Sequence, residues 1–312
     1  MSLWPGTLKV SETLVAQLKQ AKPADGQLPP TWLSQWDDLW CPVAAWLAEK
    51  VTASQTPLIL GIHGGQGSGK STLSNALKGI YKEAFDWNVV VISIDDLYLS
   101  HAERAALGET THPLLRTRGV PGTHDAHLGI RLFQQLKSLK SGETLKFPAF
   151  DKASDDRLPP TDWHTVSGPV DLIIFEGWCV GCTPVSAEAL STPLNPLEAT
   201  EDSDGRWREW VNRQLATLYR DWFDLIDELI MLKVPDMDAV LRWRSQQETE
   251  NRANAQGTTD RSFSDQALVR FIQHYERLTR QALDSLPANA SLVLNINQSH
   301  EVDAVTCGGR SQ

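Results

Sequence analysis

Cysteine is scarce in this sequence, and basic residues are outnumbered by acidic ones. Four cysteines in 312 residues, unevenly spread, give no disulfide framework and favour a reducing compartment. Lysine and arginine number 29 against 39 aspartates and glutamates, a formal net charge of −10, which argues against the basic surface that nucleic-acid binding needs. No apolar run reaches the roughly eighteen residues of a membrane span, and no signal-peptide pattern opens the chain. We therefore expect a cytoplasmic protein without nucleic-acid or membrane partners, and the oligomeric state stays open.

Two of the cysteines, Cys179 and Cys182, form a C-x-x-C pair. One pair supplies half of a zinc site, and Cys41 and Cys307 show no matching spacing. A thioredoxin-like redox role requires flanking residues that this stretch lacks. We interpret the pair as small packing residues.

The sequence does contain a phosphate-binding loop. The run GGQGSGKS at residues 64–71 fits the pattern G-x-x-x-x-G-K-[ST], with an apolar run before it and a helical pattern after it. Its glycines let successive backbone N–H groups face an anion, Lys70 would reach the β- and γ-phosphates, and the Ser71 hydroxyl would help hold Mg²⁺. The predicted nucleoside triphosphate site consists of Gly64, Gly65, Gln66, Gly67, Ser68, Gly69, Lys70, Ser71 and Thr72.

Five short apolar runs are typical of buried parallel strands, because they lack the alternation of a half-exposed strand. They occupy residues 57–62, 89–94, 171–175, 228–234 and 291–296. Helical patterns lie between them, at residues 128–139, 207–223 and 264–286. This alternation predicts an α/β protein, a phosphate-loop (P-loop) NTPase sandwich of three layers with a five-stranded parallel sheet.

An extension and two insertions complete the expected organisation. Residues 1–50 are helical in pattern, and Trp32, Trp36 and Trp40 recur at four-residue spacing, as on one helix face. We expect this extension to pack on a main domain at residues 51–312. Within that domain we expect an acceptor-site insertion at residues 97–170 and a lid segment at residues 236–260. The acidic stretch at residues 198–205 is expected to be an exposed loop.

Carboxylates follow two of the predicted strands. Asp95 and Asp96 end the second strand, and Glu176 ends the third. Ligands of open α/β sheets bind at the carboxyl ends of the strands, and phosphoryl transfer needs a held Mg²⁺ and an oriented, deprotonated hydroxyl. Glu176 suits Mg²⁺ or its bound water, and Asp95 suits the base, although spacing alone does not decide between Asp95 and Asp96. A helix N-cap is the alternative role for any one of these carboxylates.

Basic residues gather in the first insertion. The stretch at residues 116–125, shaped by glycine and proline, carries Arg118 and His124, and Lys152 and Arg157 follow. These groups suit an anionic substrate, and arginine in particular binds a carboxylate through two nitrogens. The alternative is ordinary ion pairing with Asp125, Asp151, Asp155 and Asp156.

Arginines also mark the second segment. Arg242, Arg244 and Arg252 lie on a helical pattern, and the spacing from Arg244 to Arg252 is about two helical turns. Arginines on a mobile segment can close over a transferring phosphate and exclude water. A solvated arginine face is the alternative.

The chain resembles the ATP-dependent D-glycerate 3-kinase family, a branch of the small-molecule phosphate-loop kinases that also include uridine kinase, phosphoribulokinase and bacterial-type pantothenate kinase. The likeness lies in GIHGGQGSGKST (61–72), SIDDLYL (93–99), RGVPGTHD (118–125), FPAFDK (147–152) and EGW (176–178). A weaker sixth stretch is WRSQQE (243–248) with Arg252. The likeness spans about residues 55–297, and RGVPGTHD is its most specific part. After FPAFDK the family carries a longer stretch with glycine and arginine, which is shortened here.

The resemblance implies roles for individual residues. Lys70, Asp95 and Arg244 would be catalytic, with Asp95 the general base, and Ser71 and Glu176 would serve Mg²⁺. Arg244 and Arg252 would be arginines of the lid. The residues that bind the acceptor would be Asp96, Tyr98, Arg118, His124, Asp125, Asp151, Lys152 and, from the lid, Arg252.

The predicted function is a small-molecule kinase that uses ATP and Mg²⁺ to phosphorylate an alcohol. The resemblance implies that this alcohol is D-glycerate, giving 3-phosphoglycerate. One alternative is a kinase for another alcohol, such as a nucleoside or a pantothenate-like compound. The other is a partner-driven ATPase or assembly factor, whereas an ordinary GTPase is disfavoured because the sequence carries no N-K-x-D motif.

Overall fold

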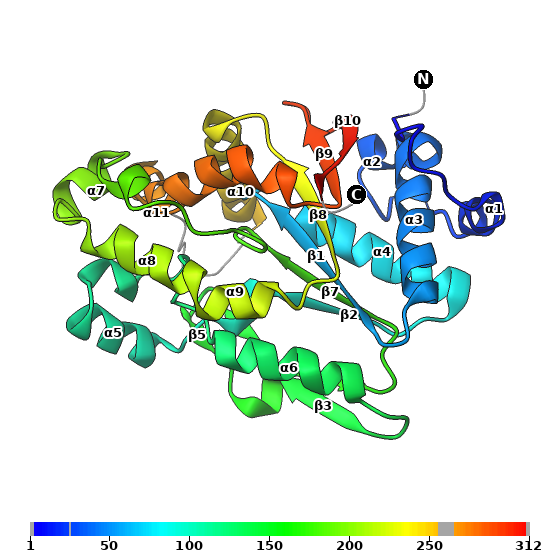
Figure 1. Cartoon of the computed structure of the whole chain (residues 1–312), viewed down its shortest axis with the longest axis horizontal. Helices are drawn as coiled ribbons and strands as arrows, with labels where there is room; N and C mark the ends of the chain where they lie inside the picture. Colours follow the sequence, from blue (N-terminus) through cyan, green and yellow to red (C-terminus); the bar gives the residue numbers. More distant parts are fainter. Residues whose placement is uncertain (1–2, 25, 255–264, 310–312) are drawn as a thin grey trace.

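The structure is a computed structural model that describes residues 3–24, 26–254 and 265–309. A six-stranded sheet in the order β10-β9-β8-β1-β7-β2 forms its centre (Figure 1). The parallel strands are β1 (Leu58–Gly64), β2 (Val89–Ser93), β7 (Leu172–Gly177), β8 (Glu228–Lys233) and β9 (Leu292–Ile296). They coincide with the five apolar runs of the sequence, so the predicted α/β class and parallel sheet are confirmed.

The five-strand prediction omits the edge strand β10 (Val302–Cys307), which is antiparallel to β9. Only Val302 and Val305 of this strand are buried, so it lacks the continuous apolar run by which the other strands are recognised. The Gln35 side chain covers the start of the edge, since its Nε2 donates to the Val302 carbonyl at 2.6 Å and its Oε1 accepts from the Val302 N–H at 3.2 Å.

Successive residues of the central strands point to opposite faces of the sheet, and each face has its own core. Leu58, Leu60 and Ile62 of β1 lie in one core, and Ile59 lies in the other. Helices contributing to the first core include α1 (Glu12–Gln20), α3 (Cys41–Ala53) and α4 (Lys70–Phe85); those of the second include α6 (Ala126–Ser138), α9 (Leu218–Phe223) and α11 (Asp265–Ser285). Figure 1 shows α3 and α4 on one side of the sheet and α6 and α9 on the other, so the three-layer sandwich is confirmed.

The tryptophans of the N-terminal segment lie together, as their spacing predicts. They lie, however, on an α-helix and a following π-helical turn and not on one continuous α-helix. Trp32 lies in α2 (Pro30–Ser34), and the π-helical turn Trp36–Trp40 leads into α3. Trp32 stacks on Trp40 with ring centroids 4.9 Å apart and lies 5.9 Å from Trp36. All three rings are buried in the core that contains α4. The segment therefore packs against the face of the sheet behind the phosphate loop.

The first insertion contributes both to the edge of the sheet and to the core. It contains α5 (His101–Thr110), α6, and two small ribbons formed by β3 (Thr144–Phe147) with β6 (His164–Ser167) and by β4 (Phe150–Asp151) with β5 (Asp156–Arg157). Leu132, Phe133 and Leu136 of α6 are buried against the sheet. Part of the segment predicted as an acceptor-site insertion therefore covers the sheet.

The acidic stretch at residues 198–205 is only partly the exposed loop that the sequence suggested, because its first half is helical and two of its carboxylates are buried. Glu198 lies in α7 (Pro196–Glu201), is fully buried, and accepts from the Arg277 Nε at 2.7 Å. Asp202 is also buried and pairs with Arg208 of α8 (Arg206–Ala216) at 2.9 Å. Because Arg277 comes from α11, the local composition gave no sign of this burial.

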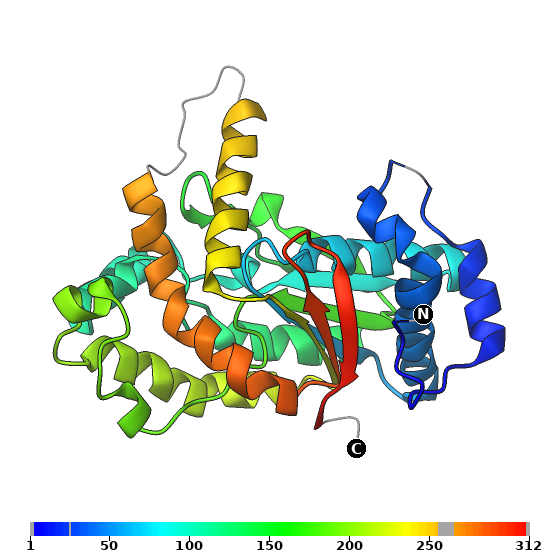
Figure 2. The same cartoon turned by 90° about the horizontal axis from the view of Figure 1, so that it is seen from above.

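The predicted helix over residues 207–223 is two helices, because α8 ends at Ala216 and α9 begins at Leu218 after an irregular Thr217. The helix α10 (Met237–Asn254) starts beside the sheet, and its later turns extend away from the body of the fold (Figure 2). In the part of the chain that the structure describes, no helix is both long and apolar enough to cross a membrane.

Candidate active site

The phosphate loop joins the central strand β1 to α4 and lies at the carboxyl edge of the sheet. Gly67 and Gly69 have φ of +78° and +90°, a left-handed conformation that side chains disfavour. Trp243 of α10 packs on this loop, and a Cβ at Gly67 would lie 2.8 Å from its Cβ. The glycines therefore serve both the turn and the close approach of α10.

The loop has the groups that Mg-ATP requires. The Gln66 Oε1 and Ser68 Oγ atoms are buried without a hydrogen-bond partner among the described residues. The Lys70 Nζ donates to the Gly65 carbonyl at 3.0 Å, so the ammonium bends over the loop. Partial burial lowers the pKa of Lys70, while the charges of Glu176 and Asp95 act to raise it. A lysine held over a glycine-rich anion cradle fits a nucleoside triphosphate.

Ser71 and Glu176 meet beside the loop, as a Mg²⁺ site would require. Glu176 lies in β7, in register with Ile62 of β1 and Ser93 of β2. The Ser71 hydroxyl donates to the Glu176 Oε1 at 3.1 Å. Hydroxyl, carboxylate and phosphate oxygens are the ligands that Mg²⁺ takes, so these two residues fit the ion.

Asp95 lies in a 3₁₀ turn, Ile94–Leu97, directly after β2. The Ser93 hydroxyl accepts from the Asp95 N–H at 3.3 Å, which starts the turn. The Lys152 Nζ lies 2.7 Å from the Asp95 carboxylate. Partial burial acts to raise the pKa of Asp95, but the Lys152 ammonium, together with the charges of His124 and Lys70, outweighs it, and the pKa lies below its ordinary value. Asp95 is thus an ionised carboxylate at the edge of the sheet.

Asp96 differs from its neighbour in partner and in pKa. Its carboxylate lies 3.5 Å from the His164 Nε2, on the ribbon formed by β3 and β6. Partial burial raises the pKa of Asp96, although His164 acts in the opposite direction. The structure therefore directs the two adjacent carboxylates to different surroundings, a distinction that spacing could not give.

Two candidate substrate-binding arginines are held by carboxylates of the first insertion. Arg118 forms an ion pair with Asp155, which is also bound at 3.1 Å by the fully buried Arg104. Arg157 lies 3.4 Å from Asp125 and donates from its Nε to the Tyr98 carbonyl at 2.6 Å. The ion pairing that the sequence offered as an alternative is present for both arginines.

Asp125 and Asp151 both bind backbone N–H groups. Asp125 caps α6 by accepting from the Leu128 N–H at 2.9 Å. Asp151 accepts from the N–H groups of Ala153 and Ser154, each at 3.0 Å, within the turn between β4 and β5. These bonds shape the loops that carry the other candidate residues.

Tyr98 and His124 lie together close to Asp95, and a residue absent from the sequence prediction joins them. The Tyr98 ring stacks on the His124 ring with centroids 4.3 Å apart. The His124 Nδ1 lies 2.6 Å from the hydroxyl of Tyr219, in α9, and all three side chains are buried. Tyr219 belongs to no motif, and only the packing of α9 against the RGVPGTHD loop brings it here.

Arg244 of α10 lies near the same loop. Its guanidinium is 5.9 Å from the centre of the Phe271 ring, and Phe271 packs against Tyr275, whose hydroxyl donates to the Arg118 carbonyl at 3.2 Å. The side chain of Arg252 lies outside the described residues. The helix predicted around these arginines is present as α10.

Cys179 and Cys182 are buried, and they form no disulfide with each other. Burial raises the pKa of both thiols. A thiol kept protonated in an apolar core is a poor nucleophile and metal ligand, so the packing interpretation is confirmed.

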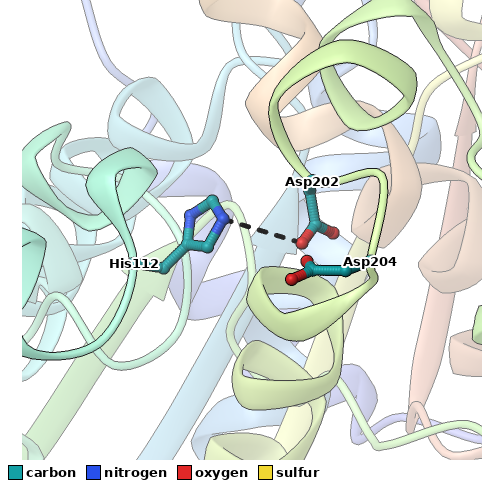
Figure 3. A group of neighbouring side chains, drawn as sticks. All are labelled: His112, Asp202 and Asp204. Atoms are coloured by element: carbon teal, nitrogen blue, oxygen red, sulfur yellow. Dashed lines mark ion pairs between the residues drawn. The ribbon is translucent and has the colours of Figure 1, made fainter.

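His112, Asp202 and Asp204 form a second group of potential metal ligands, on segments other than the phosphate loop and its flanking strand and helix (Figure 3). Its carboxylates already have donors. Asp202 accepts from the Trp207 N–H at 2.7 Å and from the Arg208 guanidinium at 2.9 Å, and Asp204 accepts from the Arg206 Nε at 2.8 Å. Two arginines and the N-terminus of α8 make this place unfavourable for a cation. We therefore assign the two aspartates to capping α8 and His112 to capping the 3₁₀ turn Pro113–Arg116, where its Nδ1 accepts from the Leu114 N–H.

Comparison with known proteins identifies the family. Over 234 residues the chain is 35% identical to the uncharacterized kinase mug58 of Schizosaccharomyces pombe, a match that covers 70% of this chain and 78% of that protein. Over 252 residues it is 30% identical to the chloroplastic D-glycerate 3-kinase of Arabidopsis thaliana, covering 76% of this chain and 52% of that protein. The solved D-glycerate 3-kinase from Cryptococcus neoformans matches with a TM-score of 0.70 and 25% identity, covering 86% of this chain and 99% of that chain.

No protein-family model matches the chain. The geometry itself places a phosphate loop, a Ser71–Glu176 pair and an ionised Asp95 at one edge of a parallel sheet. The chain belongs to the D-glycerate 3-kinase family of phosphate-loop kinases, which is related to uridine kinase.

Proposed function

We propose that this kinase phosphorylates D-glycerate at its 3-hydroxyl, with Mg-ATP as donor. The observation that carries the proposal is the contact between Lys152 and Asp95 at 2.7 Å, which puts a cation beside the candidate base. A small hydroxy acid offers one partner to each group, its hydroxyl to Asp95 and its carboxylate to Lys152. An uncharged alcohol has no anionic group with which Lys152 could form an ion pair.

Lys152 suits this role better than the neighbouring arginines do. Its side chain is 63% exposed and sits on the turn between β4 and β5. Arg118 and Arg157 are each held by a carboxylate and are mostly buried. A long, exposed lysine can exchange Asp95 for a substrate carboxylate at little conformational cost. We therefore assign the carboxylate of the acceptor to Lys152, with Arg118 and His124 lining the pocket.

Asp95 is the proposed general base. The low pKa of its carboxyl keeps it ionised at neutral pH, and the arriving hydroxyl can hydrogen-bond to it directly. Asp96, whose pKa is raised, faces His164 and is proposed to line the acceptor pocket without acting as the base. When Lys152 turns to the substrate, Asp95 loses its ammonium partner, its pKa rises, and it becomes a better proton acceptor.

On the donor side, Lys70 and residues 64–72 hold the phosphates, and Ser71 with Glu176 holds Mg²⁺. When bound, Mg-ATP would supply the phosphoryl group, and the Mg²⁺ ion would supply positive charge that offsets the negative charge of the phosphate oxygens. Arg244, which lies on the helix that packs against the loop through Trp243, is proposed to reach the transferring phosphoryl group. In this proposal residues 236–260, of which 255–260 lie outside the described residues, act as the lid, and residues 1–50 are a packed extension. Arg252 is assigned to the lid from the sequence alone.

The test is ADP release from the purified protein with Mg-ATP and single acceptors. D-Glycerate should give a strong rise, while glycerol, the matched triol without a carboxylate, should give little. Uridine, pantothenate and ribulose 5-phosphate complete the panel. A response to one of these in place of D-glycerate would contradict the proposed acceptor. ATP hydrolysis at the same rate with and without each acceptor would favour a partner-driven ATPase instead.

A further inference from the structure

A chain of hydrogen bonds runs from the RGVPGTHD loop through Tyr219 to His124. The Tyr219 hydroxyl oxygen accepts from the Gly122 N–H at 2.8 Å and lies 2.6 Å from the His124 Nδ1. Tyr219 is fully buried and His124 is 3% exposed. Within the described residues, Nδ1 of His124 is the only acceptor in reach of the Tyr219 O–H. The hydroxyl proton therefore points to Nδ1.

This arrangement selects one form of the imidazole. If Nδ1 carried a proton, the Tyr219 O–H would be buried without an acceptor, at a cost of about 1–3 kcal/mol. Nδ1 is therefore the acceptor, and the ring proton sits on Nε2. Burial lowers the pKa of His124 to about 3, against the opposing charge of Asp95, so the ring is neutral at neutral pH.

The Nε2–H group is then a donor without an acceptor. Nε2 is buried and has no hydrogen-bond partner among the described residues. Buried N–H groups nearly always have a partner. The other unpartnered ring N–H groups include tryptophans of the hydrophobic cores, whereas His124 lies among the candidate acceptor-pocket residues, where a ligand can supply the missing acceptor. The His124 ring stacks on Tyr98, which follows Asp95 by three residues, and its charge state is coupled to that of Asp95. The ring that carries the free donor is thus close enough to the candidate base to interact with its charge.

We propose that His124 donates its Nε2–H to an oxygen atom of the bound acceptor, and that Tyr219 is the positioning residue that fixes His124 in this neutral tautomer. The inference rests on the proposed function, because it places the acceptor beside Asp95. It adds that the acceptor must carry, close to the hydroxyl that reacts, a second oxygen able to accept a hydrogen bond. Hydroxy acids and vicinal diols have such an oxygen, whereas simple alcohols do not.

Nitrogen NMR of the full-length protein with labelled histidine tests the tautomer directly. The His124 signals are identified by their loss in His124→Gln. Between about pH 5.5 and 8, where an ordinary histidine titrates, Nε2 should remain protonated and Nδ1 unprotonated, and the Nε2 signal should shift on adding D-glycerate. A protonated Nδ1, an imidazolium, or an Nε2 signal unmoved by saturating acceptor would overturn the proposal.

Kinetics of Tyr219→Phe test the positioning role. The KM for the acceptor should rise about tenfold, which corresponds to about 1.4 kcal/mol, while the KM for ATP stays within about twofold. The matched control is Tyr81→Phe, which also removes a buried hydroxyl, here one that donates to the Ala44 carbonyl at 2.8 Å in the other core. Equal changes in both KM values, or equal effects of the two variants, would show a merely structural role.

The test separates this inference from the proposed acceptor. The tautomer is measured in the free protein and needs no substrate. If the acceptor panel selects an alcohol other than D-glycerate, the titration and the kinetics are run with that alcohol. A wrong acceptor and a wrong tautomer therefore give different results.

Discussion

The Lys152 ammonium and the Asp95 carboxylate lie 2.7 Å apart, although one belongs to the turn between β4 and β5 and the other follows β2. The contact connects the first insertion to the carboxyl edge of the sheet, beside the phosphate loop. Lys152 is 63% exposed and Asp95 is 28% exposed, so a small anion can reach both groups. This pair is the proposed meeting point of substrate carboxylate, substrate hydroxyl and base.

Lys152→Met should weaken the acceptor side specifically. Loss of the ammonium removes the partner of the substrate carboxylate, and we expect the KM for D-glycerate to rise at least about tenfold, since a charge-assisted hydrogen bond contributes roughly 1.5–3 kcal/mol. Without the Lys152 ammonium, the effect of burial on Asp95 is opposed only by the weaker charge effects of His124 and Lys70, so its pKa should rise and the acidic limb of kcat/KM should move to higher pH.

The matched control for this prediction is Lys146→Met, because Lys146 is an exposed lysine of the neighbouring strand β3. It should leave both the KM and the pH profile unchanged. Identical behaviour of the two variants would contradict a role for Lys152 in binding.

Asp95→Asn and Asp96→Asn should differ although the residues are adjacent. The first variant loses the base, and kcat should fall by about 10²–10⁴, the usual contribution of general base catalysis. The second alters the contact with His164 and should change kcat far less. Steady-state rates at saturating ATP and acceptor check this, and a greater loss of kcat in Asp96→Asn would reverse the assignment.

Lys70→Ala should abolish turnover while the fold persists. The Lys70 ammonium contacts only the loop carbonyl of Gly65 among the hydrogen bonds described, so its loss removes phosphate binding and little packing. Circular dichroism and thermal melting should match the unaltered protein, and activity should fall by at least about 10³, as for other electrostatic contacts to a reacting group. Retention of most activity would rule out the phosphate-loop mechanism.

Acid should destabilise the protein partly through two buried histidines, His63 and His124. Burial lowers the pKa of each to about 3, against an ordinary value of 6.5. Below pH 6.5 these two histidines therefore bind protons in the unfolded chain, but in the folded chain they stay neutral down to about pH 3. The free energy of unfolding therefore decreases as the pH is lowered from 6.5 to about 3. Each histidine should contribute about 1.4 kcal/mol per pH unit within it.

Urea unfolding at several pH values measures this slope. His63→Asn keeps a donor for the Val180 carbonyl, which lies 3.0 Å from the His63 Nδ1, and should reduce the slope. His127→Asn, at an exposed position of α6, should not. Equal slopes in all three proteins would show that the buried histidine takes no part in the acid response.

The sequence predicts the donor side of this site better than the acceptor side. The phosphate loop is continuous in the chain, and its strand and helix are fixed by the same short stretch, so residues 64–72 could be identified without tertiary information. Glu176 and Asp95 follow apolar strands, and parallel strands bring their carboxyl ends together. These features depend on local pattern and on one rule of sheet topology.

The acceptor side depends on contacts between distant segments. Asp155 binds Arg104, which is 51 positions away in the sequence, and Arg118, 37 positions away. Tyr219 reaches His124 across 95 positions. Neither the charge of Asp155 nor the hydroxyl of Tyr219 distinguishes it from a surface residue in the sequence. Burial and partner choice here come from packing, as they do for Glu198 and for the edge strand β10.

The position of phosphorylation tests the central claim most directly. Phosphorus NMR of a reaction containing the protein, Mg-ATP and D-glycerate follows ATP, ADP and the new ester together. We predict one ester, 3-phosphoglycerate, formed in equal amount to ADP, and its formation at least about 10²-fold slower with Asp95→Asn. An ester at the 2-hydroxyl, or ADP accompanied only by inorganic phosphate, would contradict the account.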